Sequence, residues 1–207
     1  LYQRQACKQG MGIDILPPDI NQSERNFTAQ GGAIRYGLSA LKSIGKAMVD
    51  QIVSERNARG PFQNLQEYLE RISECDLSKR IVESLIKAGA LDCLEGNRRQ
   101  KMMIYTSIMD NISQSKKKMM AGQMSLFDIV DDELKSDFEI KFPKVNEFSK
   151  QELLAFEKEV IGLYVSGHPL EEYQNMWKKN ITRTSLDFQL NDEDETAVAD
   201  NAGEIIG

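Results

Sequence analysis

The sequence predicts a mainly α fold with a small β element near the N-terminus and a truncated β start at the C-terminus. Apolar residues recur at helical spacing over most of residues 38–177. Breaks at Gly45 and Gly89 divide that pattern into helical pairs joined by tight turns. Short apolar runs bounded by Pro or Gly occur before residue 37 and after residue 196. We therefore expect tandem helical hairpins flanked by short strands.

The first short runs predict a small sheet that leads into the first hairpin. Ile13–Leu16 reads as a strand that stops at the prolines 17 and 18. Two further runs, 27–28 and 33–36, flank the turn at Gly31 and Gly32.

The stretch 37–56 organises the chain, because its apolar positions predict two short helices on either side of a break at residues 43–46. The N-terminus of the second helix would offer unpaired N–H groups and partial positive charge to an anion. Gly45 would let a phosphate approach closely. This pattern is typical of a helix-hairpin-helix element, which holds the DNA backbone without reading bases. The candidate DNA-binding residues are Lys42, Ser43, Ile44, Gly45 and Lys46. The alternative is an ordinary helical hairpin in which the glycine only caps a helix.

A second, degenerate unit is predicted around Gly89. A loop at 57–61 precedes a helix capped by Asn64 and Glu67, whose apolar face is Leu65, Tyr68, Leu69 and Ile72. Ile81, Val82, Leu85 and Ile86 form the next stripe. After the break, Asn97 and Gln100 open a helix with Met102, Met103, Ile108, Met109 and Ile112 on one face. Gly89, Arg98 and Arg99 are further candidate DNA contacts, although an exposed helix face explains the arginines equally well.

Residues 116–146 read as a mostly extended or mobile linker. Lys116, Lys117 and Lys118 suit the negative end of the preceding helix. The apolar pair within Gln123, Met124, Ser125, Leu126 and Phe127 needs a partner, because it interrupts a polar segment. It either packs back onto its own domain or docks into a pocket on another protein.

Beyond the linker, Ser149 and Glu152 form a capping box for a helix that ends near Gly162. His168, between Gly167 and Pro169, reads as a turn or cap residue rather than a catalytic base. From residue 182 the pattern changes to short, acidic, strand-like pieces.

Charge divides the chain in two. Residues 1–122 carry 18 Lys and Arg against 13 Asp and Glu, whereas residues 123–207 carry 8 against 19. The basic part suits phosphate, and the acidic part would be repelled by it. No run is apolar and long enough for a membrane span, and no signal peptide is recognisable, so we expect a cytoplasmic segment of a larger protein. The widely spaced Cys7, Cys75 and Cys93 predict free thiols and no metal site. No phosphate loop or nucleophile–base pair indicates an independent enzyme.

Several blocks carry a family resemblance. In chain order they are MGIDILPPDINQSERNFT, AIRYGLSALKSIGKAMVDQIVSER, GPFQNLQEYLERI, LSKRIVESLIKAGALDCL, NRRQ, QMSLFD and LAFEKEVIGLYVSGHPLEEY. Together they resemble the C-terminal part of bacterial replicative DNA polymerase III alpha subunits, over about residues 6–173. The resemblance implies the end of a fingers domain at 1–32 and a tandem helix-hairpin-helix domain at 33–115. It further implies a linker with a sliding-clamp-binding motif at 116–146, a helical connector at 147–190, and the truncated start of an OB-fold domain at 191–207.

The resemblance also implies a function. The parent enzyme would be a DNA-directed DNA polymerase using magnesium at palm aspartates outside this sequence, so the fragment itself would hold no catalytic residue and no cofactor. Its partners would be double-stranded DNA, the sliding clamp through Gln123–Phe127, and other replisome subunits. One departure concerns the hairpin, where Ser43 stands in place of a frequent glycine and restricts the turn. The alternative function is a helical protein-interaction scaffold without DNA binding.

Overall fold

The computed structural model describes residues 13–73, 77–120 and 142–171, together with residues 173 and 180. The chain divides into two compact units, residues 1–166 and 167–207. Every element below belongs to the first unit. In the described part of the chain, no helix is both long and apolar enough to cross a membrane.

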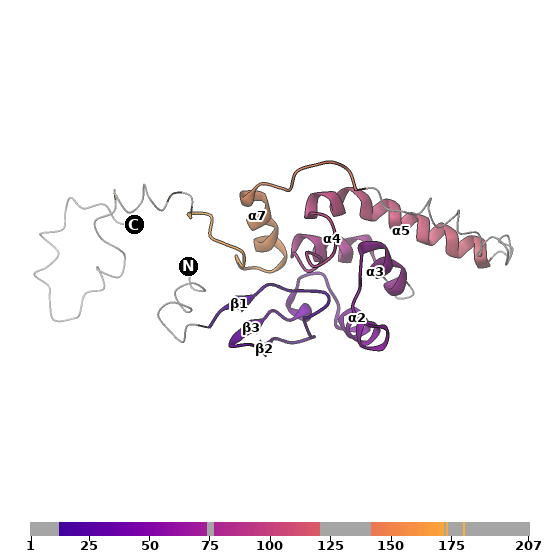
Figure 1. Ribbon diagram of the computed structural model, residues 1–207, viewed down its shortest axis with the longest axis horizontal. Coiled ribbons are helices and arrows are strands. Elements are labelled where there is room, and N and C mark those ends of the chain that lie inside the picture. The colour runs from indigo at the N-terminus through magenta and orange to yellow at the C-terminus, as the bar shows by residue number, and fades with distance from the viewer. Residues whose placement is uncertain (1–12, 74–76, 121–141, 172, 174–179, 181–207) are drawn as a thin grey trace, which may run out of the picture. The chain divides into compact units, whose positions relative to one another are not determined.

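The predicted small sheet is confirmed. Its strands are β1 (Ile15–Leu16), β2 (Thr28–Gln30) and β3 (Ala33–Arg35), in the order β1-β3-β2 (Figure 1). β3 pairs in parallel with β1 and antiparallel with β2, where Ala29 faces Ile34. Gly31 and Gly32 turn between β2 and β3 at φ 58° and 84°, which glycine tolerates without strain. The strands end where the chain enters the hairpin.

The prediction of two helices in the first hairpin is half right. The second is the α-helix α2 (Lys46–Arg59), but the first is only a single 3-10 turn, η2 (Leu38–Ala40). Leu41 already has extended backbone, and the next amide, that of Lys42, donates to the carbonyl of Val160 at 3.0 Å. A tertiary hydrogen bond therefore replaces the helical one. α2 is longer than expected, so the loop predicted at 57–61 begins only at Gly60.

The next three helices are α3 (Leu65–Ile72), α4 (Lys79–Lys87) and α5 (Arg98–Met120). The Asn64 side chain accepts the N–H of Glu67, as predicted, but the Glu67 carboxylate accepts from Gln63 rather than from Asn64. The box at Asn97 and Gln100 is reciprocal, at 2.8 and 2.9 Å. Helix starts were therefore predictable from local capping chemistry.

The last helix of this unit, α7 (Lys150–Val160), starts at the predicted Ser149–Glu152 capping box and ends before Gly162 at φ 84°. α7 packs against α4 (Figure 1). The predicted linker 116–146 needs correction at both ends. Residues 116–120 continue α5, and Val145 and Pro143 accept hydrogen bonds from Asn97 and Gln100. The end of the linker is therefore bound to the start of α5.

The core joins the sheet, the hairpin and the helices into one cluster. It contains the predicted stripes of α3 and α4, with Ile81 only partly buried. Met103 is 55% exposed, so its assignment to the apolar face of α5 is wrong; Tyr105 is buried instead. The core also encloses charged side chains that periodicity did not predict, among them Lys101 and Glu157. His168, in the second unit, accepts the N–H of Leu170 at Nδ1, as expected of a cap residue.

Candidate nucleic-acid interface

The first hairpin presents a short polar edge above a buried anchor. Ile44 is 7% exposed and belongs to the core, whereas its neighbours Ser43 and Gly45 are exposed. Ser43 has φ 69°, the left-handed conformation that glycine tolerates best. The buried isoleucine thus fixes the turn, and the residues on either side of it face outwards.

The N-terminus of α2 is open. Its N-cap, Gly45, has no side chain to accept the first helical N–H groups, and the first turn contains no acidic residue. The N–H groups of the first three helical residues have no intrahelical partner by helix geometry. A Cβ built on Gly45 meets no atom within 4 Å. Together with the exposed Lys42 and Lys46, this end of α2 can hold an anion such as a phosphate.

The hairpin rests on the C-terminal end of α7. Besides the bond from Lys42 to Val160, the Tyr36 hydroxyl donates to the carbonyl of Ile161 at 3.2 Å. Burial raises the pKa of Tyr36, which further favours the protonated hydroxyl that donates this bond. A segment more than 100 residues away in sequence therefore fixes the position of the candidate DNA-binding turn.

The second helix-hairpin-helix unit, around Gly89, is closed at the corresponding place. Gly89 is buried at φ 75°, and a Cβ there would overlap the guanidinium of Arg98 and the carboxylate of Asp92. The space that is open at Gly45 is thus filled at Gly89 by the protein itself. A phosphate cannot approach Gly89 in this structure.

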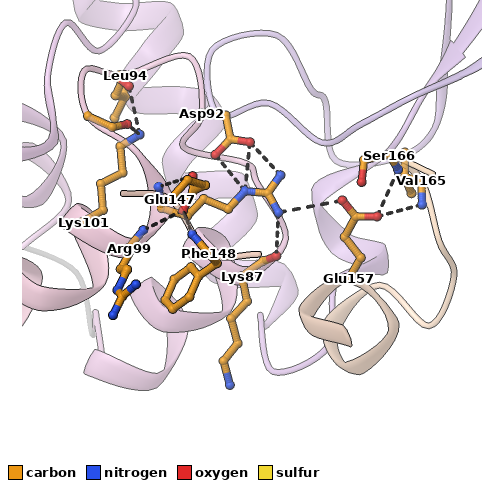
Figure 2. Close-up of polar contacts among 12 residues, drawn as sticks. Lys87, Asp92, Leu94, Arg99, Lys101, Glu147, Phe148, Glu157, Val165 and Ser166 are labelled. Carbon is orange, nitrogen blue, oxygen red and sulfur yellow. Dashed lines mark hydrogen bonds and ion pairs between the residues drawn. The ribbon is translucent and has the colours of Figure 1, made fainter. Parts of the chain in front are cut away.

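Arg98 is engaged inside the protein. Its Nε lies 3.0 and 2.9 Å from the two carboxylate oxygens of Asp92, and its Nη1 lies 3.8 Å from Oε1 of the buried Glu157. The carboxylates of Asp92 and Glu157 and the carbonyl of Lys87, all labelled in Figure 2, surround this guanidinium. Burial alone would lower the pKa of Arg98, but the Asp92 carboxylate outweighs it and raises the pKa. Arg98 therefore joins α4, α5 and α7 and is not available to DNA.

Arg99 remains at the surface. Its N–H donates to Glu147 at 3.1 Å, and its guanidinium lies 5.8 Å from the ring centroid of Phe148. The side chain is exposed, so it can reach a ligand (Figure 2). The predicted clamp-binding residues Gln123–Phe127 lie outside the described residues.

Several residues that support the site were not predicted. Glu147 accepts the N–H groups of Arg98 and Arg99 and so caps α5 from a distant segment. Glu157 is 2% exposed and accepts the N–H groups of Val165 and Ser166. Glu157 interrupts the apolar stripe of α7, three residues after Leu154 and three before Val160, a signal that could have identified it. No local signal marks Glu147.

The described residues contain no group of three or more His, Cys, Asp or Glu side chains that could hold a metal ion. Of the cysteines, Cys93 falls in the described part, where it is a free thiol.

Comparisons with known proteins agree with this geometry. A family model described as a helix-hairpin-helix motif matches residues 12–101. A protein of Mycobacterium leprae is 40% identical over 79% of this chain, and one of Neisseria meningitidis is 38% identical over 91%. A Mycobacterium tuberculosis protein is also 40% identical, over 79%. All three are named DNA polymerase III subunit alpha, and the chain spans 14 to 16% of their lengths. These matches confirm the resemblance that the sequence blocks indicate.

Proposed function

We propose that this chain is a segment of a bacterial replicative DNA polymerase alpha subunit and that it contacts the backbone of duplex DNA. Nucleotidyl transfer, with its magnesium ions, would belong to the remainder of that protein. The similarity to named alpha subunits and the helix-hairpin-helix match support this assignment. We keep the domain roles that the resemblance implies for residues 1–32, 33–115, 116–146, 147–190 and 191–207. The one change is that the last helix of the second segment extends to Met120.

One observation carries the DNA contact: α2 begins at an uncapped glycine in open space. Backbone N–H groups recognise phosphate oxygens regardless of base sequence. Lys42 and Lys46 add positive charge beside them, and the Ser43 hydroxyl can donate a further hydrogen bond. Binding through this turn is therefore sequence-independent and weakens as salt rises. From the second helix-hairpin-helix unit, only the exposed Arg99 remains in the proposed DNA-binding surface. Gly89 and Arg98 instead stabilise the structure of that unit.

The second part of the proposal concerns the sliding clamp. Gln123 follows the last residue of α5 by three positions, and the chain is bound to the same domain again by Pro143. Because the chain is anchored to this domain on both sides of Gln123, the motif is tethered to the domain that carries the DNA-binding hairpin. Tethering by the Leu126–Phe127 anchors would raise the local concentration of the polymerase on DNA, which favours rebinding over release.

A titration with labelled duplex DNA at low and moderate salt tests the DNA contact. We expect salt-sensitive binding that Lys46→Glu weakens at least several-fold, because the substitution replaces an attractive charge with a repulsive one. Unchanged affinity of this variant at low salt would remove the hairpin from the interface. In parallel, the double variant Leu126→Ala/Phe127→Ala should lose binding to a purified bacterial sliding clamp and keep DNA binding. Normal clamp binding by the double variant would refute the motif assignment.

A further inference from the structure

A polar groove of about 480 Å³ lies beside the hairpin. Lys42 and Ser43 line it from the first helix-hairpin-helix unit, Arg80 and Lys87 line it from α4 of the second unit, and Glu159 lines it from the end of α7. The groove therefore joins the open hairpin to the second helix-hairpin-helix unit, whose own turn at Gly89 is closed.

One lysine in the groove is already paired with carboxylates. The Lys87 amine lies 2.9 Å from a carboxylate oxygen of Glu83 and 2.9 Å from one of Glu159. Burial by itself would lower the pKa of Lys87, but the hydrogen bonds to the two carboxylates outweigh it and raise the pKa. Lys87 thus stays charged, and it is shared between two carboxylates rather than left for a ligand.

Arg80 differs from Lys87. It is exposed in the second position of α4, and within the described part of the chain no ion pair engages either Arg80 or Lys42. A cation near a helix N-terminus is unfavourable for the helix itself, since that end carries partial positive charge. Among the described residues, the helix dipole therefore gives no favourable partner to Arg80, whereas an anionic ligand in the groove would.

We propose that this groove is a second phosphate site for the duplex held by the hairpin, with Arg80 as its cation and Glu159 as a carboxylate that weakens binding. This inference rests on the proposed function. One strand would pass from the N–H groups at Gly45 across Lys42 to Arg80, so that both units contact the same backbone. The groove takes over the role that sequence reasoning gave to Gly89 and Arg98.

The test compares three variants of the 207-residue chain with the wild type in the DNA titration across several salt concentrations. Arg80→Ala should weaken binding on the order of fivefold at low salt, and it should lower the slope of log affinity against log salt by about 1. Glu159→Gln should tighten binding about twofold or more, since it removes repulsion but leaves Glu83 to pair with Lys87. The matched control is Arg59→Ala, which removes one charge from the last residue of α2, about 20 Å from the hairpin along that 14-residue helix.

The two substitutions have opposite expected signs, which a purely structural effect would not produce. The melting temperature of Arg80→Ala should be equal to or slightly above that of the wild type, because alanine favours the helix and an unfavourable cation is removed from the N-terminus of α4. If the wild type binds and Lys46→Glu weakens binding while Arg80→Ala and Glu159→Gln behave like Arg59→Ala, the groove proposal is wrong and the hairpin proposal stands. If the wild type does not bind DNA at any salt concentration, both proposals fail.

Discussion

Among the residues that the structure describes, Ser43 is the one non-glycine residue with a left-handed backbone, at φ 69°. An L-residue in this region costs about 1 kcal/mol or more, because its Cβ crowds the following carbonyl. Glycine removes that cost but loses more chain entropy on folding, by about 0.5 kcal/mol or more. We therefore expect Ser43→Gly to leave stability unchanged or raise it by up to about 1 kcal/mol in urea unfolding. Ser43→Val should destabilise by at least that amount, since branching at Cβ worsens the crowding. A destabilised glycine variant would show instead that the serine side chain supports the turn.

Gly45 offers a cleaner separation of stability from binding. Its φ of −73° suits any L-residue, and a Cβ there meets no protein atom within 4 Å. Gly45→Ala should thus fold normally and lose at most about 1 kcal/mol of stability, because alanine is a poorer N-cap than glycine. If a phosphate approaches this turn as proposed, the added methyl group should weaken duplex binding about tenfold, the loss of one charged hydrogen bond. The comparison is a melting curve and a DNA titration on the same samples; full affinity in the alanine variant would mean that no phosphate lies against Gly45.

Cys93 gives a prediction about pH. Cys93 is an exposed residue, but partial burial of its sulfur, assisted by the neighbouring Asp19 carboxylate, raises its pKa from 9.0 to about 11. Since the thiolate is the reactive form, the folded chain at pH 9 should be alkylated at Cys93 roughly fifty times more slowly than the chain in urea. Peptide mapping after timed iodoacetamide treatment separates Cys93 from the other two cysteines. Because the folded state retains the proton, this group stabilises the fold below pH 9, and that contribution is lost as pH rises through about 11. Equal rates in both states would contradict the raised pKa.

At the scale of elements, α5 depends on a cap that comes from another segment. The Glu147 carboxylate accepts the N–H groups of Arg98 at 2.9 Å and Arg99 at 3.1 Å, and it also receives the N–H of Phe148. Glu147→Ala should cost about 1 to 2 kcal/mol of unfolding free energy, the usual worth of a helix cap with its favourable charge. It should also speed hydrogen exchange at the Arg98 and Arg99 amides.

The control for this cap is Lys144→Ala, an exposed change in the same segment. We expect it to leave both the unfolding free energy and the exchange rates near those of the wild type. If Glu147→Ala behaves in the same way, the contact to α5 contributes little to stability.

The sequence predicted those elements whose cause is local. The capping boxes at Asn97 and Ser149 and the glycine turn at Gly31 depend only on residues a few positions away. The predictions of these helix starts and of the sheet were therefore correct. η2 was overestimated because the hydrogen bond from Lys42 to Val160 spans more than 100 residues. Gly89 and Arg98 form a pair in space that closes the second turn, and nothing in their spacing distinguishes that turn from the open one at Gly45.

Buried charged side chains were likewise not predictable from the sequence. Lys101 is fully buried, and its amine donates to the carbonyls of Leu94 and Gly96 (Figure 2). Burial lowers the pKa of Lys101, because removal from water disfavours the charged ammonium group. The sequence places Lys101 beside a helical cap, but only the fold shows the loop wrapped around its amine.

At the scale of the whole molecule, the acidic C-terminal part should weaken DNA binding by the basic part. Residues 172–207 contain 8 Asp and Glu against 3 Lys and Arg, so a chain ending at residue 171 would change from a net charge of −6 to −1. These residues belong to the second compact unit, 167–207, whereas the hairpin belongs to the first. We expect the shortened chain to bind duplex DNA several-fold more tightly at low salt, because long-range repulsion is reduced.

Screening distinguishes this effect from a lost contact. Charges farther apart than about 10 Å are largely screened at 0.1 M salt, so the affinities of the two chains should converge there. By contrast, the loss of affinity caused by removing a direct phosphate contact, as in Lys46→Glu, should persist at that salt concentration. The melting temperature of the first unit should not change, which excludes altered folding as the cause. An affinity gain that stays constant from low to high salt would mean that residues 172–207 cover the DNA-binding surface instead of repelling DNA from a distance.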